Sequence, residues 1–260
     1  MSQIPAAIRL VSTDFDGTVH EDHVRPGIPA ALQRKISTLQ KAGVTWVINT
    51  GRDMASLLQS LGHSDISVRP DYVVVVEREI FRRVGPSHYV PIEPWNTQCT
   101  SDHTDLFQAL ATQVAHLKAH LTEAHPAHFY ADNYSPLCVV AQDNEQMDII
   151  EQTICTSMRS FPATQIVRNS IYLRLAHHGY SKGTALAELQ RILSIAAEHT
   201  VVAGDHLNDL PMLDPTYARY LISPYNSVPP VRSRVQLHGG YLASKSAGHG
   251  ILEGLLALGI

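Results

Sequence analysis

The sequence predicts an α/β protein in which one parallel sheet is interrupted by a smaller α+β segment. Short β-prone runs alternate with amphipathic stretches over the first third of the chain, a rhythm typical of parallel sheets. From about residue 102 the order becomes helix–strand–strand, written twice, and after Gly179 the alternation returns. Hairpins pair antiparallel, so the middle segment differs from its flanks. We expect a core domain of residues 1–85 and 180–260, and an inserted α+β domain of residues 86–179.

The first part of the core is expected to contain three strands and two helices. Strands are predicted where apolar, β-branched residues run together, and helices where apolar residues recur every three or four positions. Gly43 closes the first helix, as glycine commonly does at helix ends. In chain order the elements are strand 8–13, helix 26–42, strand 44–48, helix 53–61 and strand 72–76.

The inserted segment is predicted from its turns as well as from its periodicity. Asp132-Asn133-Tyr134-Ser135-Pro136 has strong turn chemistry and joins two short β-prone runs. The predicted elements are helix 102–124, strands 127–131 and 137–142, helix 144–158, and strands 165–168 and 171–176.

The second part of the core repeats the strand–helix alternation. Ser181 is placed to cap the helix that follows the inserted segment. The predicted elements are helix 181–197, strand 199–203, short helix 209–213, strand 217–222 and helix 246–258.

Two carboxylates stand directly after the first strand, in Asp14-Phe15-Asp16-Gly17-Thr18. In open α/β sheets, ligands bind outside the carboxyl ends of the strands. Two carboxylates one residue apart, on a turn opened by Gly17, can reach one small site, where one attacks phosphorus and the other moves a proton. Taken alone, these residues fit equally well a turn whose Asp side chains only bond to nearby amides.

Three further polar groups lie at the ends of later elements. Thr50 and Gly51 follow the second strand and offer a hydroxyl and N–H groups to an anion. Lys182 begins the helix after the inserted segment, where the helix N-terminus also favours negative charge. A second carboxylate pair follows the next core strand, in Gly204-Asp205-His206-Leu207-Asn208-Asp209. Each has an ordinary explanation alone, but their joint placement at element ends favours one site.

Together these segments resemble the four sequence motifs of haloacid dehalogenase hydrolases, in the right order. The matching segments, between Ile8 and about Leu213, are DFDGT, NTGRD, SKGTAL and GDHLNDLPML. The inserted segment lies between the second and third motifs and resembles the type IIB cap of the Cof-like and sucrose-phosphatase-like branch. The resemblance implies a Rossmann-like core and a phosphatase acting on a small phosphate monoester, with a sugar phosphate as the expected substrate.

The resemblance also implies roles for the motif residues. Asp14 would be the nucleophile that forms an aspartyl-phosphate, and Asp16 would protonate the leaving group and then activate water. Mg²⁺ would be bound by Asp14, the backbone carbonyl of Asp16, Asp205 and Asp209. The phosphoryl group would be bound by Thr50, Gly51, Lys182 and Asn208. These roles fit the physics, because an ionised Asp14 repels a phosphate dianion unless Mg²⁺ and Lys182 intervene.

Three features depart from the family pattern or fall outside it. Val76-Glu77-Arg78-Glu79-Ile80 follows the third strand, where this branch usually carries a Glu-Asn-Gly-like stretch. Because these residues include no glycine, the sequence predicts neither the conformation of the turn nor a substrate contact there. His206 is interpreted as a bystander. In the cap, Tyr134 is expected to reach the substrate or, equally, to lie in an exposed loop.

Composition and motif content limit the classes of partner and activity. The formal net charge is −4 and Lys and Arg are not clustered, so neither a nucleic acid nor an anionic membrane is expected. Residues 1–5 show no signal peptide, and no apolar run could span a bilayer, so a cytoplasmic protein is expected. The alternatives are a phosphomutase and a phospholigand-binding protein without turnover. A dehalogenase is disfavoured, because Asp16 and Asp205 would have no use there.

Overall fold

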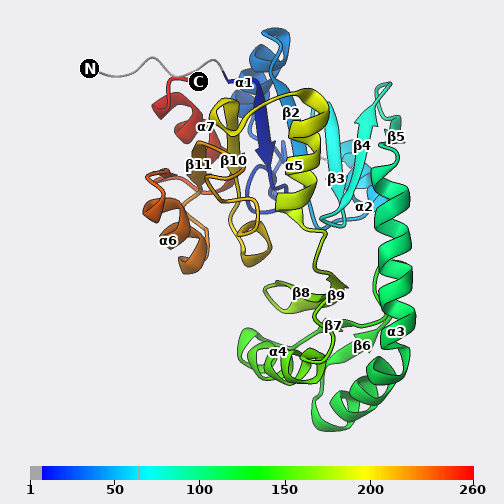
Figure 1. Cartoon of the computed structure of the whole chain (residues 1–260). Coiled ribbons are helices and arrows are strands. Elements are labelled where there is room, and N and C mark those ends of the chain that lie inside the picture. Colours follow the sequence, from blue (N-terminus) through cyan, green and yellow to red (C-terminus); the bar gives the residue numbers. More distant parts are fainter. Residues whose placement is uncertain (1–7, 64) are drawn as a thin grey trace. The chain divides into compact units, whose positions relative to one another are not determined.

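The computed structural model describes residues 8–63 and 65–260 and divides into two compact units. The core unit comprises Met1–Glu93 and Ser181–Ile260, and the cap unit comprises Pro94–Tyr180 (Figure 1). The expectation about a signal peptide concerns residues that lie outside the described ones. The insertion was expected to begin at residue 86, but the structure starts the cap unit eight residues later.

In the described part of the core unit, eight strands form one sheet in the order β12-β11-β10-β1-β2-β3-β4-β5. All neighbours are parallel from β12 to β3, and β4 and β5 extend the sheet antiparallel. The strands are β1 Leu10–Thr13, β2 Thr45–Asn49, β3 Tyr72–Val75, β4 Glu79–Arg83, β5 Tyr89–Pro91, β10 Thr200–Ala203, β11 Tyr220–Ser223 and β12 Tyr241–Leu242.

Register aligns the carboxyl ends of the central strands. Thr13 of β1 stands opposite Ala203 of β10 and Ile48 of β2. Every residue of β1 and β10 is buried, which explains their apolar and β-branched sequences. The residues that follow these strands therefore emerge at one edge of the sheet.

Helices of the core unit pack on this sheet and on each other. Helices α1 and α7 contact each other and lie on β2 and β11, whereas α5 contacts β4 and the turn η2. Ser181 caps α5 as predicted, since its side chain accepts a hydrogen bond from the Thr184 N–H. The helical elements are α1 Ala30–Lys41, α2 Met54–His63, α5 Lys182–Leu193, η1 Ala197–His199, η2 Leu207–Asp209, α6 Pro229–Leu237 and α7 Ala247–Ala257.

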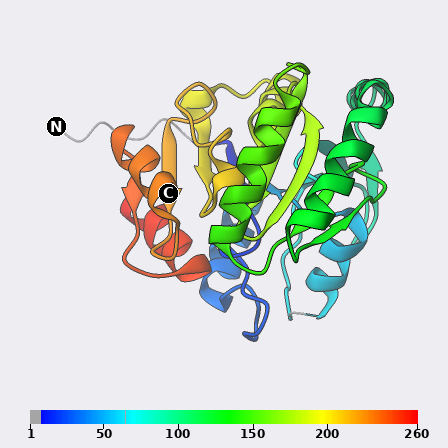
Figure 2. The ribbon, with the colours of Figure 1, turned by 90° about the horizontal axis from the view of Figure 1, so that it is seen from below.

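The cap unit is an antiparallel sheet with two helices, as the α+β prediction required. Its strands follow the order β6-β7-β9-β8. Figure 2 looks onto α3 and α4, which lie over the strands and enclose an apolar core that includes Leu110, Ile154 and Leu173. The elements are α3 Trp95–Ala124, β6 His128–Tyr130, β7 Cys138–Val140, α4 Asn144–Met158, β8 Thr164–Asn169 and β9 Tyr172–His177.

Several elements of the structure were not predicted. Strands β4 and β5 were missed because Glu79–Arg83 is rich in charge, as suits strands near a sheet edge. Phe81 pairs with Pro91, and this pairing keeps β5 in the core unit and moves the boundary from residue 86 to 94. Helix α6 and the two-residue β12 were also missed. The helix expected at 102–124 begins earlier, at Trp95, and the one expected at 209–213 is a 3₁₀ turn at 207–209.

Within residues 8–63 and 65–260, no helix combines the length and apolar character that crossing a membrane requires.

We predict that Leu110→Ala destabilises the protein by about 2–5 kcal/mol, because it opens a cavity in the cap core. Leu110 is fully buried, whereas Leu237 is 77% exposed. Leu237→Ala serves as the control and should change stability by no more than about 0.5 kcal/mol. Urea unfolding followed by circular dichroism measures both variants. Equal losses would contradict the described packing.

Candidate active site

Three carboxylates predicted as metal ligands come together at the carboxyl edge of the sheet. Asp14 directly follows β1, and its N–H donates to the Ala203 carbonyl of β10 at 2.9 Å. Asp14, Asp205 and Asp209 each place one carboxylate oxygen within 4.8 Å of the others. Carboxylate oxygens are the ligands that Mg²⁺ prefers, so this donor set fits the expected cation.

Lys182 lies between two of these carboxylates. Its Nζ donates to Asp14 Oδ1 and to Asp209 Oδ1, both at 2.6 Å, and the residue is 1% exposed. Burial alone would lower the pKa of Lys182, but the charges of Asp14 and Asp209 outweigh it and raise the pKa. The side chain is therefore an ammonium that donates to both carboxylates.

Close packing holds the start of α5, where Lys182 lies. Asn49, the last residue of β2, donates from Nδ2 to the Lys182 carbonyl at 2.9 Å. A Cβ on Gly183 would stand 2.3 Å from the Pro211 carbonyl oxygen, so only glycine allows this approach. The motif glycine thus brings α5 against the segment that carries Asp209.

The carboxylates carry more negative charge than one lysine balances. Burial, reinforced by the charge of Asp209, raises the pKa of Asp14 well above its usual range, although Lys182 opposes the shift. Burial and the charge of Asp209 also raise the pKa of Asp205 to about 7. A divalent cation at this cluster would relieve the repulsion.

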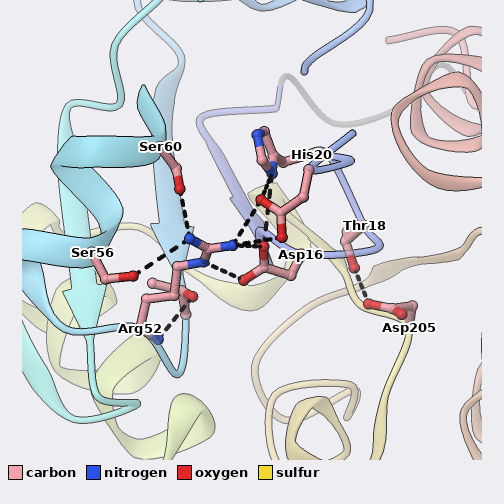
Figure 3. Close-up of polar contacts among 9 residues, drawn as sticks. Asp16, Thr18, His20, Arg52, Ser56, Ser60 and Asp205 are labelled. Atoms are coloured by element: carbon pink, nitrogen blue, oxygen red, sulfur yellow. Dashed lines mark hydrogen bonds and ion pairs between the residues drawn. The ribbon is translucent and has the colours of Figure 1, made fainter. Parts of the chain in front are cut away.

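The loop after β10 is fixed by Asp209 and Thr18. Asp209 Oδ2 accepts the N–H groups of Asp205 at 2.8 Å and His206 at 2.9 Å. Thr18 donates from Oγ1 to Asp205 Oδ1 at 2.7 Å (Figure 3). Thr18 was not among the predicted site residues, although it ends the first motif, DFDGT.

Gly17 and Asn226 also hold Asp205. Gly17 has φ +72°, and a Cβ there would stand 2.5 Å from Asp205 Oδ2, so the turn requires glycine. Asn226 donates from Nδ2 to the Gly17 carbonyl at 2.8 Å and to Asp205 Oδ2 at 3.4 Å. Sequence reasoning missed Asn226, because no motif or periodicity marks it.

Asp16 is held by Arg52 in a two-pronged ion pair (Figure 3). Arg52 donates from Nε to Oδ2 at 2.7 Å and from Nη2 to Oδ1 at 2.6 Å. Burial alone would raise the pKa of Asp16, but the contact with His20, whose Nδ1 lies 3.7 Å from Oδ1, and the hydrogen bonds from Arg52 lower it overall. In this arrangement the Asp16 carboxylate is ionised, and both of its oxygens accept hydrogen bonds from Arg52. Arg52 belongs to the second motif, NTGRD, but was not predicted as a site residue.

The predicted phosphate-binding residues Thr50, Gly51 and Asn208 lie in one corner of the site. Thr50 is 1% exposed, and its Oγ1 accepts the Arg52 N–H at 3.1 Å. A Cβ on Gly51 would stand 3.8 Å from Asn208 Nδ2 and 3.3 Å from Glu77 Oε1. A hydroxyl, backbone N–H groups and an amide thus adjoin a fourth group, the carboxylate of Glu77.

The turn after β3 forms without glycine. Val76 and Glu77 have φ of 45° and 66°, in the left-handed region, and the Arg78 N–H closes the turn on the Val75 carbonyl at 3.1 Å. Such a conformation costs on the order of 1–3 kcal/mol for each residue, more for a β-branched one, and persists only when its surroundings enforce it. The sequence did not predict the conformation of this turn, because the stretch contains no glycine. In the structure its backbone is strained.

Tyr134 lies in the cap unit, in the turn between β6 and β7. Its backbone N–H donates to Asp132 Oδ1 at 2.8 Å, in the turn chemistry expected there. Its contact with a substrate stays a prediction. The backbone of His206 is used by Asp209, and the reading of its side chain as a bystander also stays a prediction.

Comparison with known proteins agrees with the geometry. A family model described as sucrose-6F-phosphate phosphohydrolase matches residues 7–258. YkrA of Bacillus subtilis (strain 168) is 24% identical over 245 residues, which cover 86% of this chain and 89% of YkrA. The sucrose-phosphatase of Synechocystis sp. PCC6803, solved with sucrose and phosphate, has a TM-score of 0.72 at 19% identity, covering 98% of this chain and 99% of that one. The subclass IIB sugar phosphatase BT4131 has a TM-score of 0.64 at 17% identity, covering 96% and 99%. At these identities the two structures establish the fold.

We predict that Mg²⁺ raises the melting temperature more at pH 8 than at pH 5. The pKa of Asp205 is about 7 in the folded protein, whereas its ordinary value is 3.8. In the protein without metal, the contribution of Asp205 to the free energy of unfolding therefore falls as the pH rises between those two values. If Mg²⁺ binds the ionised cluster, a hundredfold excess over Kd should stabilise the folded protein by about 2.7 kcal/mol.

Thermal melts with MgCl₂ or a chelator at both pH values measure this difference. Asp205→Asn is the control and should lose most of the Mg²⁺-dependent shift. A shift of the same size at both pH values would contradict the assignment of the cluster.

Proposed function

The chain belongs to the sucrose-6F-phosphate phosphohydrolase family of the haloacid dehalogenase superfamily, and on that basis we propose that it hydrolyses a small sugar phosphate through an aspartyl-phosphate. As a family member it is a phosphoric monoester hydrolase. The mechanism rests on one observation, the buried contact of Asp14 with Lys182 at 2.6 Å beside Asp205 and Asp209. A carboxylate held by a buried cation, next to a cation-binding cluster, suits attack on phosphorus.

In the first step Asp14 attacks phosphorus. Lys182 holds Oδ1, so the attack comes from Oδ2 and breaks the bond between phosphorus and the sugar oxygen. Because Asp16 is ionised in the structure, it takes up a proton from solvent before this step and then gives that proton to the leaving alkoxide, while the phosphoryl group stays on Asp14. When bound, Mg²⁺ would be held by Asp14, Asp205, the Asp16 carbonyl and Asp209, and would offset the repulsion between Asp14 and the phosphate.

In the second step a water molecule hydrolyses the aspartyl-phosphate. Asp16 takes a proton from the water, whose oxygen bonds to phosphorus as the Asp14–phosphorus bond breaks and phosphate leaves. The pKa of Asp16 is lowered because its contacts with His20 and Arg52 outweigh burial, so the carboxylate stays ionised after it has given up its proton, which is the charge state that a base needs in this step. Thr50, Gly51, Asn208 and Lys182 would orient the transferring group, since phosphoryl transfer depends mainly on positioning and charge.

A sugar phosphate is the substrate class that the comparisons favour. The family model carries a sugar phosphatase description, and the Synechocystis neighbour binds sucrose and phosphate. The deciding experiment is a screen of phosphorylated sugars and nucleotides with the purified protein and Mg²⁺. Free phosphate is the readout, and isomerised sugar phosphate is followed in parallel. Isomerisation without phosphate release would indicate a phosphomutase instead.

We predict that Asp14→Asn abolishes turnover and leaves the fold intact, because an amide of similar size cannot attack phosphorus. Asp16→Ala should slow the reaction by about 10²–10⁴-fold, as expected for a positioned acid and base. Steady-state kinetics measure both variants, with circular dichroism as the control for folding. Wild-type rates in Asp14→Asn would exclude the covalent mechanism.

We predict that Tyr134→Ala changes substrate choice more than it changes the chemistry. The four motifs come from the core unit, so the cap is expected to supply contacts to the leaving group. Losing one polar contact should cost about 1–3 kcal/mol, or roughly ten- to a hundredfold in kcat/KM. The variant is compared with wild type on several sugar phosphates and on p-nitrophenyl phosphate. An unchanged KM and ranking would show that Tyr134 does not contact the substrate.

A further inference from the structure

We propose that Glu77 is a positioning residue, whose carboxylate fixes the orientation of the Asn208 side-chain amide in the phosphate-binding corner. The inference rests on the proposed function, because it assigns a role within the same site. No motif includes Glu77, and it occupies the stretch in which the sequence departs from the family pattern.

The backbone of the turn after β3 brings Glu77 to this corner. The Glu77 N–H donates to the Thr50 carbonyl and the Val76 N–H donates to the Arg52 carbonyl, both at 2.9 Å. These bonds tie the turn to the loop that carries the second motif. They also hold Val76 and Glu77 in the left-handed conformation, which glycine would adopt without strain. A strained backbone kept at the edge of an active site suggests that the side chain it positions has a function.

The side chains of Glu77 and Asn208 meet in a buried contact. Asn208 donates from Nδ2 to Glu77 Oε1 at 2.8 Å, and the two residues are 9% and 6% exposed. Gly51 leaves room for this contact, since a Cβ there would stand 3.3 Å from the same Oε1. The contact joins the turn after β3 to the fourth motif, 131 residues further along the chain.

The chemistry of the two groups fixes the direction of the amide. A carboxylate only accepts hydrogen bonds, whereas an Asn amide has a donor side and an acceptor side. Glu77 therefore keeps Nδ2 of Asn208 towards the Thr50–Gly51 loop. If the amide were flipped, Oδ1 would face both the Glu77 carboxylate and the phosphate. Each of these contacts would place two hydrogen-bond acceptors against each other. Within the described residues Oδ1 has no hydrogen-bond partner, so Glu77 alone holds the amide.

The arrangement leaves one N–H of Asn208 for the substrate. Nδ2 carries two hydrogens, of which Glu77 accepts one. Nδ2 lies 3.8 Å from the position of a Cβ on Gly51, which is itself a predicted phosphate-binding residue, and we assign the second N–H to the phosphoryl group. Glu77 acts on the phosphoryl group through Asn208 and does not need to contact it.

A double-mutant cycle tests this role. Glu77→Ala and Asn208→Ala should each lower kcat/KM for p-nitrophenyl phosphate roughly ten- to a hundredfold, as expected when a buried hydrogen bond is lost. The double variant should be little worse than Asn208→Ala, because the amide that Glu77 orients is then absent. Glu77→Gln should lie between wild type and Glu77→Ala, since its amide can pair with either side of Asn208. Additive losses in the double variant would overturn the proposal.

Gln33→Ala is the matched control for stability. Gln33 is 5% exposed in the core unit and donates from Nε2 to the Ile28 carbonyl at 2.7 Å. This variant should lower the melting temperature and leave kcat/KM unchanged. If it lowers kcat/KM as much as Glu77→Ala at an equal loss of stability, Glu77 is only structural and the proposal fails.

Binding of inorganic phosphate separates this proposal from the proposed function. Titration calorimetry with inorganic phosphate in the presence of Mg²⁺ measures phosphate affinity for the wild type, the two single variants and the double variant. It gives the same double-mutant cycle without any catalytic turnover. Coupling between Glu77 and Asn208 in phosphate affinity would support the positioning role even if no sugar phosphate were hydrolysed. Independent effects on phosphate affinity would refute that role and leave the phosphatase assignment intact.

Discussion

The buried ammonium of Lys182 is the group on which the site depends. Taking a charge out of water costs several kcal/mol, and attraction offsets this cost only when partners and geometry are good. Lys182 meets the condition with two carboxylate contacts of 2.6 Å. Asp14 directly follows β1 and Asp209 lies in the turn η2 after β10, so one cation holds together two segments whose carboxylates would otherwise repel each other. The packing of Gly183 and the bond from Asn49 serve the placement of this one side chain.

Strand order explains why so few residues suffice to build the site. β1 lies between β10 and β2, and the ends of all three strands are level. The first, second and fourth motifs therefore start from adjacent positions, and short loops complete the site. Hydrogen bonds between side chains then fix each loop. They join Arg52 to Asp16, Thr18 and Asn226 to Asp205, and Asn208 to Glu77. The rigid sheet supplies the position and the loops supply the chemistry.

The sequence predicted those features that depend on residues close together in the chain. Helix α4 has the predicted bounds, Asn144–Met158, because its apolar spacing and its cap at Asp143 are both local. The motif residues could be grouped because each follows a strand or begins a helix. By contrast, β4 and β5 are charged and become strands only by pairing, so periodicity gives no sign of them. The pairs Arg52–Asp16 and Glu77–Asn208 join residues 36 and 131 positions apart, which no local pattern encodes.

The insertion of the cap between the two halves of the core has a consequence for biosynthesis. β1 is made early, but its neighbour β10 and the partner of Asp14, Lys182, lie beyond the cap in the chain. While the ribosome adds these residues, the cap already has its complete set of strands and its own apolar core. The cap can therefore fold first, whereas the core waits for the C-terminal segment to close its sheet. Until then, one edge of β1 stays unpaired, the state in which strands are most prone to aggregate.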